Sequence, residues 1–424
     1  MRAQLPFAFG KSRKKAIDCA AYTPYPKVMT KAKKTIHIHT NSLDHFAANK
    51  LEQIAHAGLT RQTRPIVRAE DMAATRNGEN FISFADNDYL GLSMHPSVKE
   101  AAASAAQLYG GGSGASRLVT GDHILYQEVE ERIARLKNTE SALVFGSGFM
   151  ANISIIPTLM GADDLIIADR LVHASMHAGI KLSGATLLLF DHNDVSSAAG
   201  LLKSHRHKYP HTLLLAEGIY SMDGDLAPIK DLATLAKNND AWFMVDDAHG
   251  LGVVGEGKGS VHATNATGMV PLQMGTLSKA VGAYGGYLAA SEAVISLMKN
   301  RARAFIYTTA LPPATLAAAN AALEIIETDK ELVSKPVAHA QYFAKALNLG
   351  TPQSPIVPII IGTAEEALKA SQFLEEHGFI VTAFRPPTVP ENTSRLRFCF
   401  SASHNKHDID TLISLVKSLN VIGP

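Results

Sequence analysis

Four short segments of the sequence combine residue types that can bind a phosphate, hold a proton and attack a carbonyl carbon. They are Gly146-Ser147-Gly148-Phe149, Glu217–Asp225, Asp246-Asp247-Ala248-His249 and Thr276-Leu277-Ser278-Lys279. Lysine is rarely buried without a partner, and burial lowers the pKa of its amine and makes it a nucleophile. Small residues on both sides of Lys279 leave room for a bulky group. The last segment therefore indicates an amine that bonds covalently to a carbonyl carbon.

Two of the other segments suggest what Lys279 would carry. A carboxylate at Asp246 can face a pyridine nitrogen and keep it protonated, so that the ring draws electrons. His249, three residues later, would reach the phenolic oxygen of the same ring. The glycine turn Gly146–Gly148 opens a helix, whose N–H groups suit a phosphate. Taken singly, each has an ordinary alternative, because an acid at a strand end commonly caps a helix and such glycine turns commonly just connect elements.

These residues must be positioned by the elements that precede them. Short apolar runs, each the length of a strand, lie at Ser141–Phe145, Leu165–Ala168, Thr186–Phe190, Thr212–Ala216 and Trp242–Val245. The segments between them, such as Ile229–Lys237 and Met150–Met160, have helical character, and Tyr126, Val129, Ile133 and Leu136 recur at helical spacing. Buried strands that alternate with helices predict a doubly wound α/β sheet, with ligands at the carboxyl ends of its strands.

Beyond about residue 330 the pattern changes to that of a smaller α+β domain. Strands are predicted at Ile356–Ile361, Phe379–Phe384 and Arg395–Phe400, and helices at Ala364–His377 and His407–Leu419. The expected organisation is a basic extension over 1–41, an N-terminal segment over 42–90, a large cofactor-binding domain over 91–330 and a small C-terminal domain over 331–424.

Composition excludes several functional classes. Of the 424 residues, 46% are hydrophobic and 19% charged, as in a globular protein with a large interior. Two distant cysteines, Cys19 and Cys399, give neither a disulfide framework nor a metal site. No apolar run reaches the length of a membrane span, so a soluble, cytoplasmic protein is expected.

Residues 1–41 hold nine Lys or Arg but one acid, Asp18, and a disordered tail is favoured over a transit peptide. The remainder is mildly acidic, which argues against nucleic-acid binding.

Taken together, the motifs resemble those of the α-oxoamine synthases, which are fold-type I pyridoxal-phosphate enzymes. The resemblance covers residues 42–420 and rests on Asn87–Leu92, Gly112–Arg117, Ser147–Phe149, His173–Ser175, Ser221–Asp225, Asp246–Gly250, Lys279 and Arg385–Pro390. Arg385–Pro390, with Arg395-Leu396-Arg397 behind it, favours the biotin-synthesis branch of the family. The resemblance implies the fold-type I architecture, with a large mostly parallel sheet domain, and pyridoxal 5'-phosphate as the cofactor.

The resemblance also implies a role for each site residue. Lys279 would hold the cofactor as a Schiff base and move protons, and Asp246 would pair with the pyridine nitrogen. His249 and Ser221 would bond near the phenolic oxygen, and His173 would stack on the ring and act in catalysis. The phosphate would be bound by Gly148, Phe149 and Thr276, helped by Thr308 or Thr309 of a second subunit. The substrate residues would be Arg397 for the carboxylate of the amino acid, and Arg61 and Thr388.

The implied reaction joins L-alanine to pimeloyl-CoA or a pimeloyl carrier protein in a homodimeric acyltransferase, with no metal. Three siblings with the same chemistry remain open: serine palmitoyltransferase, 5-aminolevulinate synthase and 2-amino-3-ketobutyrate CoA ligase. A catalytically idle partner subunit of the same fold is an alternative of another class, but such a chain need not keep Lys279, Asp246 and His249. A dinucleotide-binding oxidoreductase is weaker still, because no strand leads into Gly110–Gly114.

Overall fold

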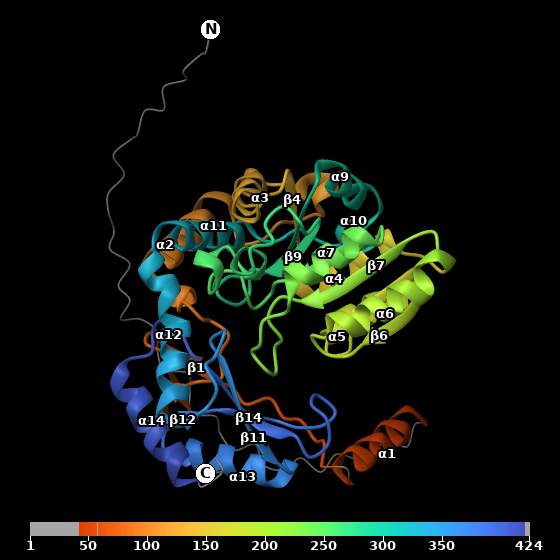
Figure 1. The fold of residues 1–424 in the computed structure, drawn as a ribbon. Coiled ribbons are helices and arrows are strands. Elements are labelled where there is room, and N and C mark those ends of the chain that lie inside the picture. Colours follow the sequence, from red (N-terminus) through yellow and green to blue (C-terminus); the bar gives the residue numbers. More distant parts are fainter. Residues whose placement is uncertain (1–41, 57, 420–424) are drawn as a thin grey trace, which may run out of the picture. The chain divides into compact units, whose positions relative to one another are not determined.

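The computed structural model describes residues 42–56 and 58–419 and divides the chain into two compact units, 1–64 and 65–424. The described part of the first unit contains the helix α1 (Ser42–His56), which has no buried residue. The basic extension predicted for residues 1–41 lies outside the described residues. The remaining elements belong to the second unit (Figure 1).

A seven-stranded sheet is the framework of the second unit. Its order is β4 (Ser141–Phe145), β10 (Gly286–Ala290), β9 (Leu272–Thr276), β8 (Trp242–Asp246), β7 (Thr212–Glu217), β5 (Leu165–Asp169) and β6 (Thr186–Phe190). β10 runs antiparallel to both of its neighbours, and the pairs from β9 to β6 are parallel. The predicted α/β sheet is therefore confirmed, and the bounds of its five predicted strands are right to within one residue, whereas β9 and β10 were not predicted.

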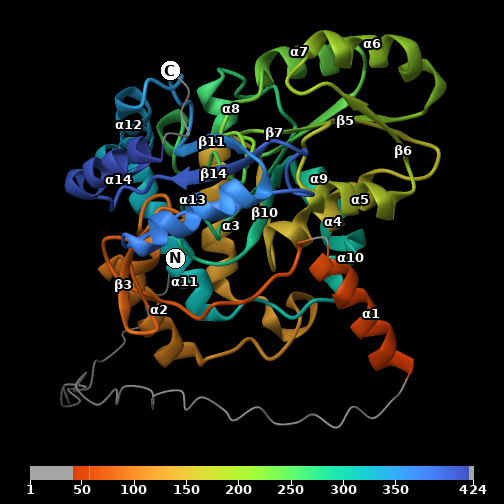
Figure 2. The same cartoon turned by 90° about the horizontal axis from the view of Figure 1, so that it is seen from below.

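Helices cover both faces of this sheet because alternate side chains of each strand point to opposite faces. Leu213 and Leu215 of β7 pack in a cluster with α4 (Gly148–Leu159) and α5 (Ala174–Ser183). Leu214, between them, packs instead with α6 (Val195–His205) and α7 (Ile229–Asn238). Figure 2 shows α6 and α7 on one side of β5 and β6 and α5 on the other.

The other helices of this part are α2, α3, α8, α9, α10 and α11. Their bounds are Pro96–Tyr109, Ile124–Lys137, Ser260–Ala263, Glu292–Arg301, Arg303–Ile306 and Pro313–Thr328. Short helical turns lie at Leu92–Met94, Arg117–Gly121, Arg206–Lys208 and Gly255–Gly257. None of the helices in the described ranges is long and apolar enough to cross a membrane.

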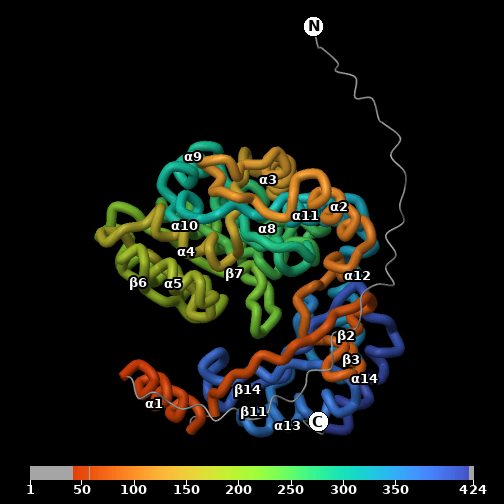
Figure 3. Tube along the Cα trace, turned by 180° about the vertical axis from the view of Figure 1, so that it is seen from behind, coloured from red at the N-terminus to blue at the C-terminus, as the bar shows by residue number. Residues whose placement is uncertain are grey.

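The C-terminal part is an α+β arrangement, as predicted. Its three-stranded sheet has the order β11 (Ile356–Gly362), β14 (Ser394–Cys399) and β13 (Thr382–Phe384), and its helices are α12 (Lys330–Ala346), α13 (Ala364–Glu376) and α14 (Lys406–Ser418). A four-stranded sheet joins β1 (Val67–Arg68), β2 (Ala73–Arg76) and β3 (Glu79–Ser83) to β12 (Phe379–Ile380). Figure 3 shows β2 and β3 next to the C-terminal elements.

The prediction of one strand over Phe379–Phe384 is wrong. The segment forms two short strands that belong to different sheets: β12 pairs in parallel with β3, and β13 pairs antiparallel with β14. Val381 separates them and is buried. The residue pattern of the segment indicates only that its backbone is extended. The change from one sheet to the other depends on pairing with β3, which is distant in the sequence.

Candidate active site

The predicted chemical segments meet at one edge of the large sheet, because β4, β7, β8 and β9 all end there. A cavity of about 230 Å³ lies at this edge. Its lining includes residues predicted from the sequence, namely Gly148, Phe149, His173, Asp246, His249, Thr276 and Lys279. It also includes Asn152, Ser175, Glu217 and Ser278, to which the sequence analysis gave no role.

The glycine turn after β4 brings backbone N–H groups close to the end of β9. Ser147 caps α4 with its hydroxyl, which accepts a hydrogen bond from the Met150 N–H at 3.2 Å. A Cβ at Gly148 would lie 3.4 Å from the Thr276 side chain, and one at Gly286 would lie 2.4 Å from the Ser147 carbonyl oxygen. The close approach therefore requires glycine at position 286. The N-terminus of α4, beside the hydroxyls of Thr276 and Ser278, has the polarity that a phosphate needs.

Asp246 is a buried carboxylate that is held by neutral donors. Its Oδ2 accepts a hydrogen bond from Asn152 Nδ2 at 2.8 Å, and its Oδ1 accepts one from the Ala248 N–H at 3.1 Å. Asn152 also donates to the Ser175 hydroxyl, which is 2.7 Å from His173 Nδ1. In the described part of the chain Asp246 forms no ion pair with a lysine, an arginine or a histidine. The carboxylate is thus free to pair with a cationic group such as a protonated pyridine nitrogen.

Lys279 supplies the amine of this cavity, and hydrogen-bonding neighbours fix the position of its Nζ. Its Nζ lies 2.7 Å from His249 Nε2, and His249 Nδ1 lies 2.7 Å from the Tyr89 hydroxyl. Burial lowers the pKa of Lys279 to about 8. Burial, together with the charge of Lys279, also places the pKa of His249 well below its ordinary value, so the ring is neutral. The Tyr89 hydroxyl also donates to Asn87 Oδ1 at 3.1 Å, so the imidazole is held between Tyr89 and Lys279.

A second cavity, of about 820 Å³, shares His173, His249 and Lys279 with the first and adds Ser221, Thr388 and Arg397. Arg397 is buried on β14 and donates to the Ser221 carbonyl oxygen at 2.5 Å and to Asn87 Oδ1 at 3.2 Å. It forms no ion pair with a carboxylate among residues 42–56 and 58–419. A buried guanidinium with only neutral partners is suited to an external carboxylate. Two residues along the strand, Arg395 instead pairs with Asp223 at 2.5 Å.

The structure gives less support to four other predicted residues. Thr308 and Thr309 do not line either one, although the Thr308 methyl group would lie 3.8 Å from a Cβ at Gly146. Arg61 is exposed and belongs to the first unit, so its assignment to the substrate stays a prediction. The Thr276 hydroxyl already donates to the Gly285 carbonyl oxygen at 2.8 Å and can offer a phosphate only its remaining capacity.

Several site residues were missed by sequence reasoning. Asn87 and Tyr89 lie in a motif on which the family resemblance rests, but they were given no role. The contact of Tyr89 with His249 joins residues 160 positions apart, so the sequence around either residue does not indicate it. Asn152 lies one turn into α4. Glu217 ends β7 directly beside Asp246 of β8, and this register could have been anticipated from the parallel strand order. Burial and the neighbouring Asp246 raise the pKa of Glu217 well above its ordinary value, so this carboxyl is protonated.

Pyridoxal phosphate fits this set of donors. The Asp246 carboxylate matches the pyridine nitrogen, the N-terminus of α4 with Ser278 matches the phosphate, and Lys279 matches the aldehyde carbon. Two buried atoms of the cavity lining, Asn152 Oδ1 and Glu217 Oε1, have no hydrogen-bond partner among the described residues and can meet polar groups of a bound molecule.

The lowered pKa of Lys279 gives a test that does not involve turnover. When the cofactor-free protein is pulsed with acetic anhydride between pH 6 and 11, labelling of Lys279 should be half-maximal near pH 8, because its amine loses its proton there. N-acetyl-lysine in the same solution should follow an ordinary amine, with a midpoint at about 10.4. Mass spectrometry of the peptide that contains Lys279 gives the ratio of labelled to unlabelled lysine at each pH. A midpoint above pH 10 would contradict the assigned environment.

The chain is similar to known proteins over most of its length. Residues 79–416 match the family described as class I and II aminotransferases. The chain is 57% identical to the 8-amino-7-oxononanoate synthase of Methylocella silvestris, over 82% of this chain and 99% of that protein. It is 53% identical to the enzyme of the same name from Beijerinckia indica, over 89% of this chain and 98% of that protein. Among solved structures, a serine palmitoyltransferase from S. paucimobilis with bound PLP-myriocin has a TM-score of 0.83 and 29% identity, over 90% of this chain and 98% of that one.

Proposed function

The chain belongs to the α-oxoamine synthases within the class I and II aminotransferase family, and from that premise we propose that it joins L-alanine to a pimeloyl thioester. The reaction forms a carbon–carbon bond between the α carbon of alanine and the thioester carbonyl, and it releases the thiol and carbon dioxide. The product is 8-amino-7-oxononanoate, a precursor of biotin. Two observations carry the proposal: relatives at 50% identity or more bear this name, and Lys279 lines both the cavity of Asp246 and the cavity of Arg397.

The residues around Lys279 would hold pyridoxal phosphate. Bound there, the cofactor supplies an electron-withdrawing ring that stabilises negative charge at the α carbon of an amino acid. Asp246 would hold the pyridine nitrogen in its protonated form, and His173 would cover the ring face. The roles proposed for the others are Ser221 and His249 at the phenolic oxygen, and Gly148, Phe149 and Thr276 at the phosphate, with Thr308 or Thr309 of a second subunit.

The chain's own groups account for the handling of the substrates. Arg397 would bind the carboxylate of alanine, and its bonds to Ser221 and Asn87 fix the direction of the guanidinium. Lys279 Nζ, unprotonated in a substantial fraction near pH 8, would take the α proton and later return one after carbon dioxide has left. His249 Nε2 lies 2.7 Å from the same amine. His173 is exposed to both cavities and would polarise the thioester carbonyl.

The larger cavity would receive the acyl thioester. Apolar side chains of Leu171, Val172, Phe384 and Val389 contribute to its lining and suit a methylene chain. Thr388 and Arg61 would contact this substrate, supplied either as the CoA ester or on a carrier protein. We also propose a cytoplasmic homodimer, in agreement with the exposed apolar side chains of Leu118, Val119 and Ile124, which are 57–73% exposed.

The function is tested by mass spectrometry of the product. The purified holoprotein is incubated with L-alanine and either pimeloyl-CoA or a pimeloyl carrier protein. Parallel reactions replace alanine by glycine or serine and the acyl donor by acetyl- or palmitoyl-CoA, because serine palmitoyltransferases are close in structure. We expect 8-amino-7-oxononanoate as the preferred product. A preference for serine with palmitoyl-CoA, or for glycine with a short acyl-CoA, would overturn the assignment.

Arg397 provides a prediction about the amino acid. Replacing it by glutamine should raise KM for L-alanine by roughly 10- to 100-fold, the size of one charge-assisted hydrogen-bonded contact, and leave KM for the acyl thioester within about twofold. Steady-state kinetics with each substrate varied in turn measure both constants. The control is Arg206→Gln, since Arg206 also binds backbone carbonyl oxygens and a carboxylate but does not line either cavity. An equal rise of both KM values would refute the role.

A further inference from the structure

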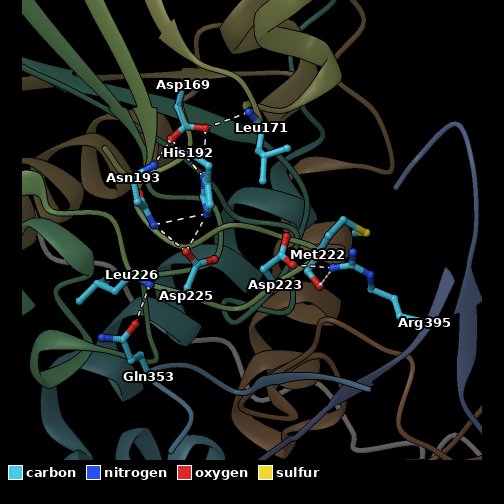
Figure 4. A network of polar contacts seen from close by, with 10 residues as sticks. All are labelled: Asp169, Leu171, His192, Asn193, Met222, Asp223, Asp225, Leu226, Gln353 and Arg395. Carbon is cyan, nitrogen blue, oxygen red and sulfur yellow. Dashed lines mark hydrogen bonds and ion pairs between the residues drawn. The ribbon is translucent and has the colours of Figure 1, made fainter. Parts of the chain in front are cut away.

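A second polar network lies beside the cavities and contains groups to which the mechanism above gives no role. His192, just after β6, lies between two carboxylates (Figure 4). Its Nδ1 is 3.1 Å from both carboxylate oxygens of Asp169, at the end of β5, and its Nε2 is 2.8 Å from Asp225 Oδ2. Asn193 Nδ2 also donates to Asp225 Oδ2, at 2.6 Å. The edge of the Tyr220 ring packs on the imidazole, with the ring centroids 4.4 Å apart.

Both ring nitrogens of His192 face carboxylates, so the ring serves as a double donor. Partial burial opposes the charge, but the hydrogen bonds to Asp169 and Asp225 raise the pKa of His192 to about 10. A charged imidazole is then present throughout the neutral range and offsets the repulsion between the two acids. Without this cation, Asp225 would have no ion pair and would lie next to the buried Asp169.

Asp225 belongs to a loop, residues 218–227, that connects β7 to α7. A bridge between Ile219 and Leu226 closes the loop, and the Tyr220 N–H donates to the Asp225 carbonyl oxygen at 3.1 Å. Gly224 has φ +74°, and a Cβ there would lie 2.4 Å from the Ile356 carbonyl oxygen. The tip of the loop thus rests directly on β11 of the C-terminal part.

The other side of the loop contacts β14. Asp223 pairs with Arg395 at 2.5 Å, and the Ser221 carbonyl oxygen accepts from Arg397 Nε at 2.5 Å. The Leu226 N–H donates to Gln353 Oε1 at 3.1 Å. Figure 4 shows Asp225 turned toward His192 and Asp223 turned toward Arg395. One short loop therefore links the end of the large sheet to the strand that carries Arg397.

We propose that His192 is a positioning residue for the amino-acid site: it fixes Asp225 to Asp169 and thereby holds Ser221 where its carbonyl oxygen aligns Arg397. The inference rests on the proposed function, because Arg397 is taken as the group that binds the carboxylate of alanine. His192 itself does not line either cavity, so its effect on the substrate is indirect.

The expected signature is a selective loss of amino-acid binding. His192→Gln keeps a hydrogen-bond donor but removes the cation and the second donor direction. We expect KM for L-alanine to rise about tenfold, with kcat, KM for pimeloyl-CoA and the cofactor content of the protein within about twofold of the wild type. His192→Arg, which keeps a cation between Asp169 and Asp225, should recover most of the loss.

The matched control is His211→Gln. His211 also pairs with an aspartate, Asp164 at 2.9 Å, but it lies at the opposite end of the same strands, next to the start of β5 and β7. All kinetic constants of this variant should stay within twofold. Asp225→Asn breaks the same contact from the loop side and serves as the second variant if His192→Gln does not fold.

Isothermal titration of the holoprotein with L-alanine separates this inference from the proposed function. If the wild type forms no product but binds alanine, and the variants bind it more weakly, the proposed function fails and the positioning role stands. Equal alanine affinity in the wild type, His192→Gln and Asp225→Asn would overturn the role. So would a loss in which both KM values, kcat and cofactor content change together, because a merely structural histidine would produce that pattern.

Discussion

Lys279→Ala should lower the rate of the condensation by about 10⁴-fold or more, because one amine has to serve as covalent attachment and as proton carrier. No other lysine lines either cavity in the described part of the chain, so no neighbouring amine can replace it. The rate is measured as 8-amino-7-oxononanoate formed per site, by mass spectrometry with an isotopically labelled standard. Binding of L-alanine to Arg397 does not require Lys279, and the loss should therefore appear in kcat.

Lys279→Arg is the sharper companion to this variant. Arginine is also long and keeps the positive charge, but its pKa, far above neutrality, prevents it from releasing a proton at neutral pH. It should be as inactive as the alanine variant. Turnover by Lys279→Arg within tenfold of the wild type would mean that charge alone suffices, and the proton-carrying role would be abandoned. The unfolding midpoints of both variants, measured by circular dichroism, serve as the control for folding.

The sequence predicted five of the seven strands of the large sheet, and two of them show how. Leu165–Asp169 and Trp242–Asp246 are continuous apolar runs that end in an acid, and such runs are typical of parallel strands. Since the carboxyl ends of parallel strands share one edge, the meeting of Asp246, His249 and Lys279 could be expected from their order alone. The change of sheet at Val381 could not, because it depends on a partner strand some 300 positions earlier.

The parts of the site that the sequence did not reveal are those built from long-range hydrogen bonds. Asn152 and Tyr89 are ordinary residues within their own segments, and they become site residues through Asp246 and His249. His192 follows a strand in the same way as Asp246 does, yet nothing in its neighbourhood indicates that Asp225 lies 2.8 Å away. Strand ends can be located from periodicity, whereas the pairing of side chains across them requires the folded chain.

A buried ion pair supports the turn that carries Asp246 and His249. Lys137, at the end of α3, pairs with Asp247, and both side chains are fully buried. Lys137 Nζ also donates to the Lys258 carbonyl oxygen at 2.8 Å, and Asp247 accepts from the Ser260 N–H at 3.0 Å and from its hydroxyl at 2.5 Å. The carboxylate leaves no space for a side chain at Gly250, where a Cβ would lie 1.9 Å from Asp247 Oδ1.

Lys137→Met should therefore lower the free energy of unfolding by about 3–5 kcal/mol, because it leaves the Asp247 carboxylate buried without a cation. Urea denaturation followed by circular dichroism measures the change. The control is Lys369→Met, which breaks the exposed pair of Lys369 with Glu365 and should leave the free energy of unfolding almost unchanged.

The double variant Lys137→Met, Asp247→Asn separates the pair from simple packing. Removing both charges eliminates the buried unpaired carboxylate, and an asparagine can still accept from Ser260, so the double variant should be more stable than Lys137→Met alone. If the losses of stability of Lys137→Met and Asp247→Asn, measured singly, simply add in the double variant, the buried charge is not the cause and the pair does not support the turn. If the double variant regains stability, its turnover tests the geometry of the turn. Asp247 lies in the chain between Asp246 and His249, so a shift of the turn should lower the turnover of the folded double variant below that of the wild type.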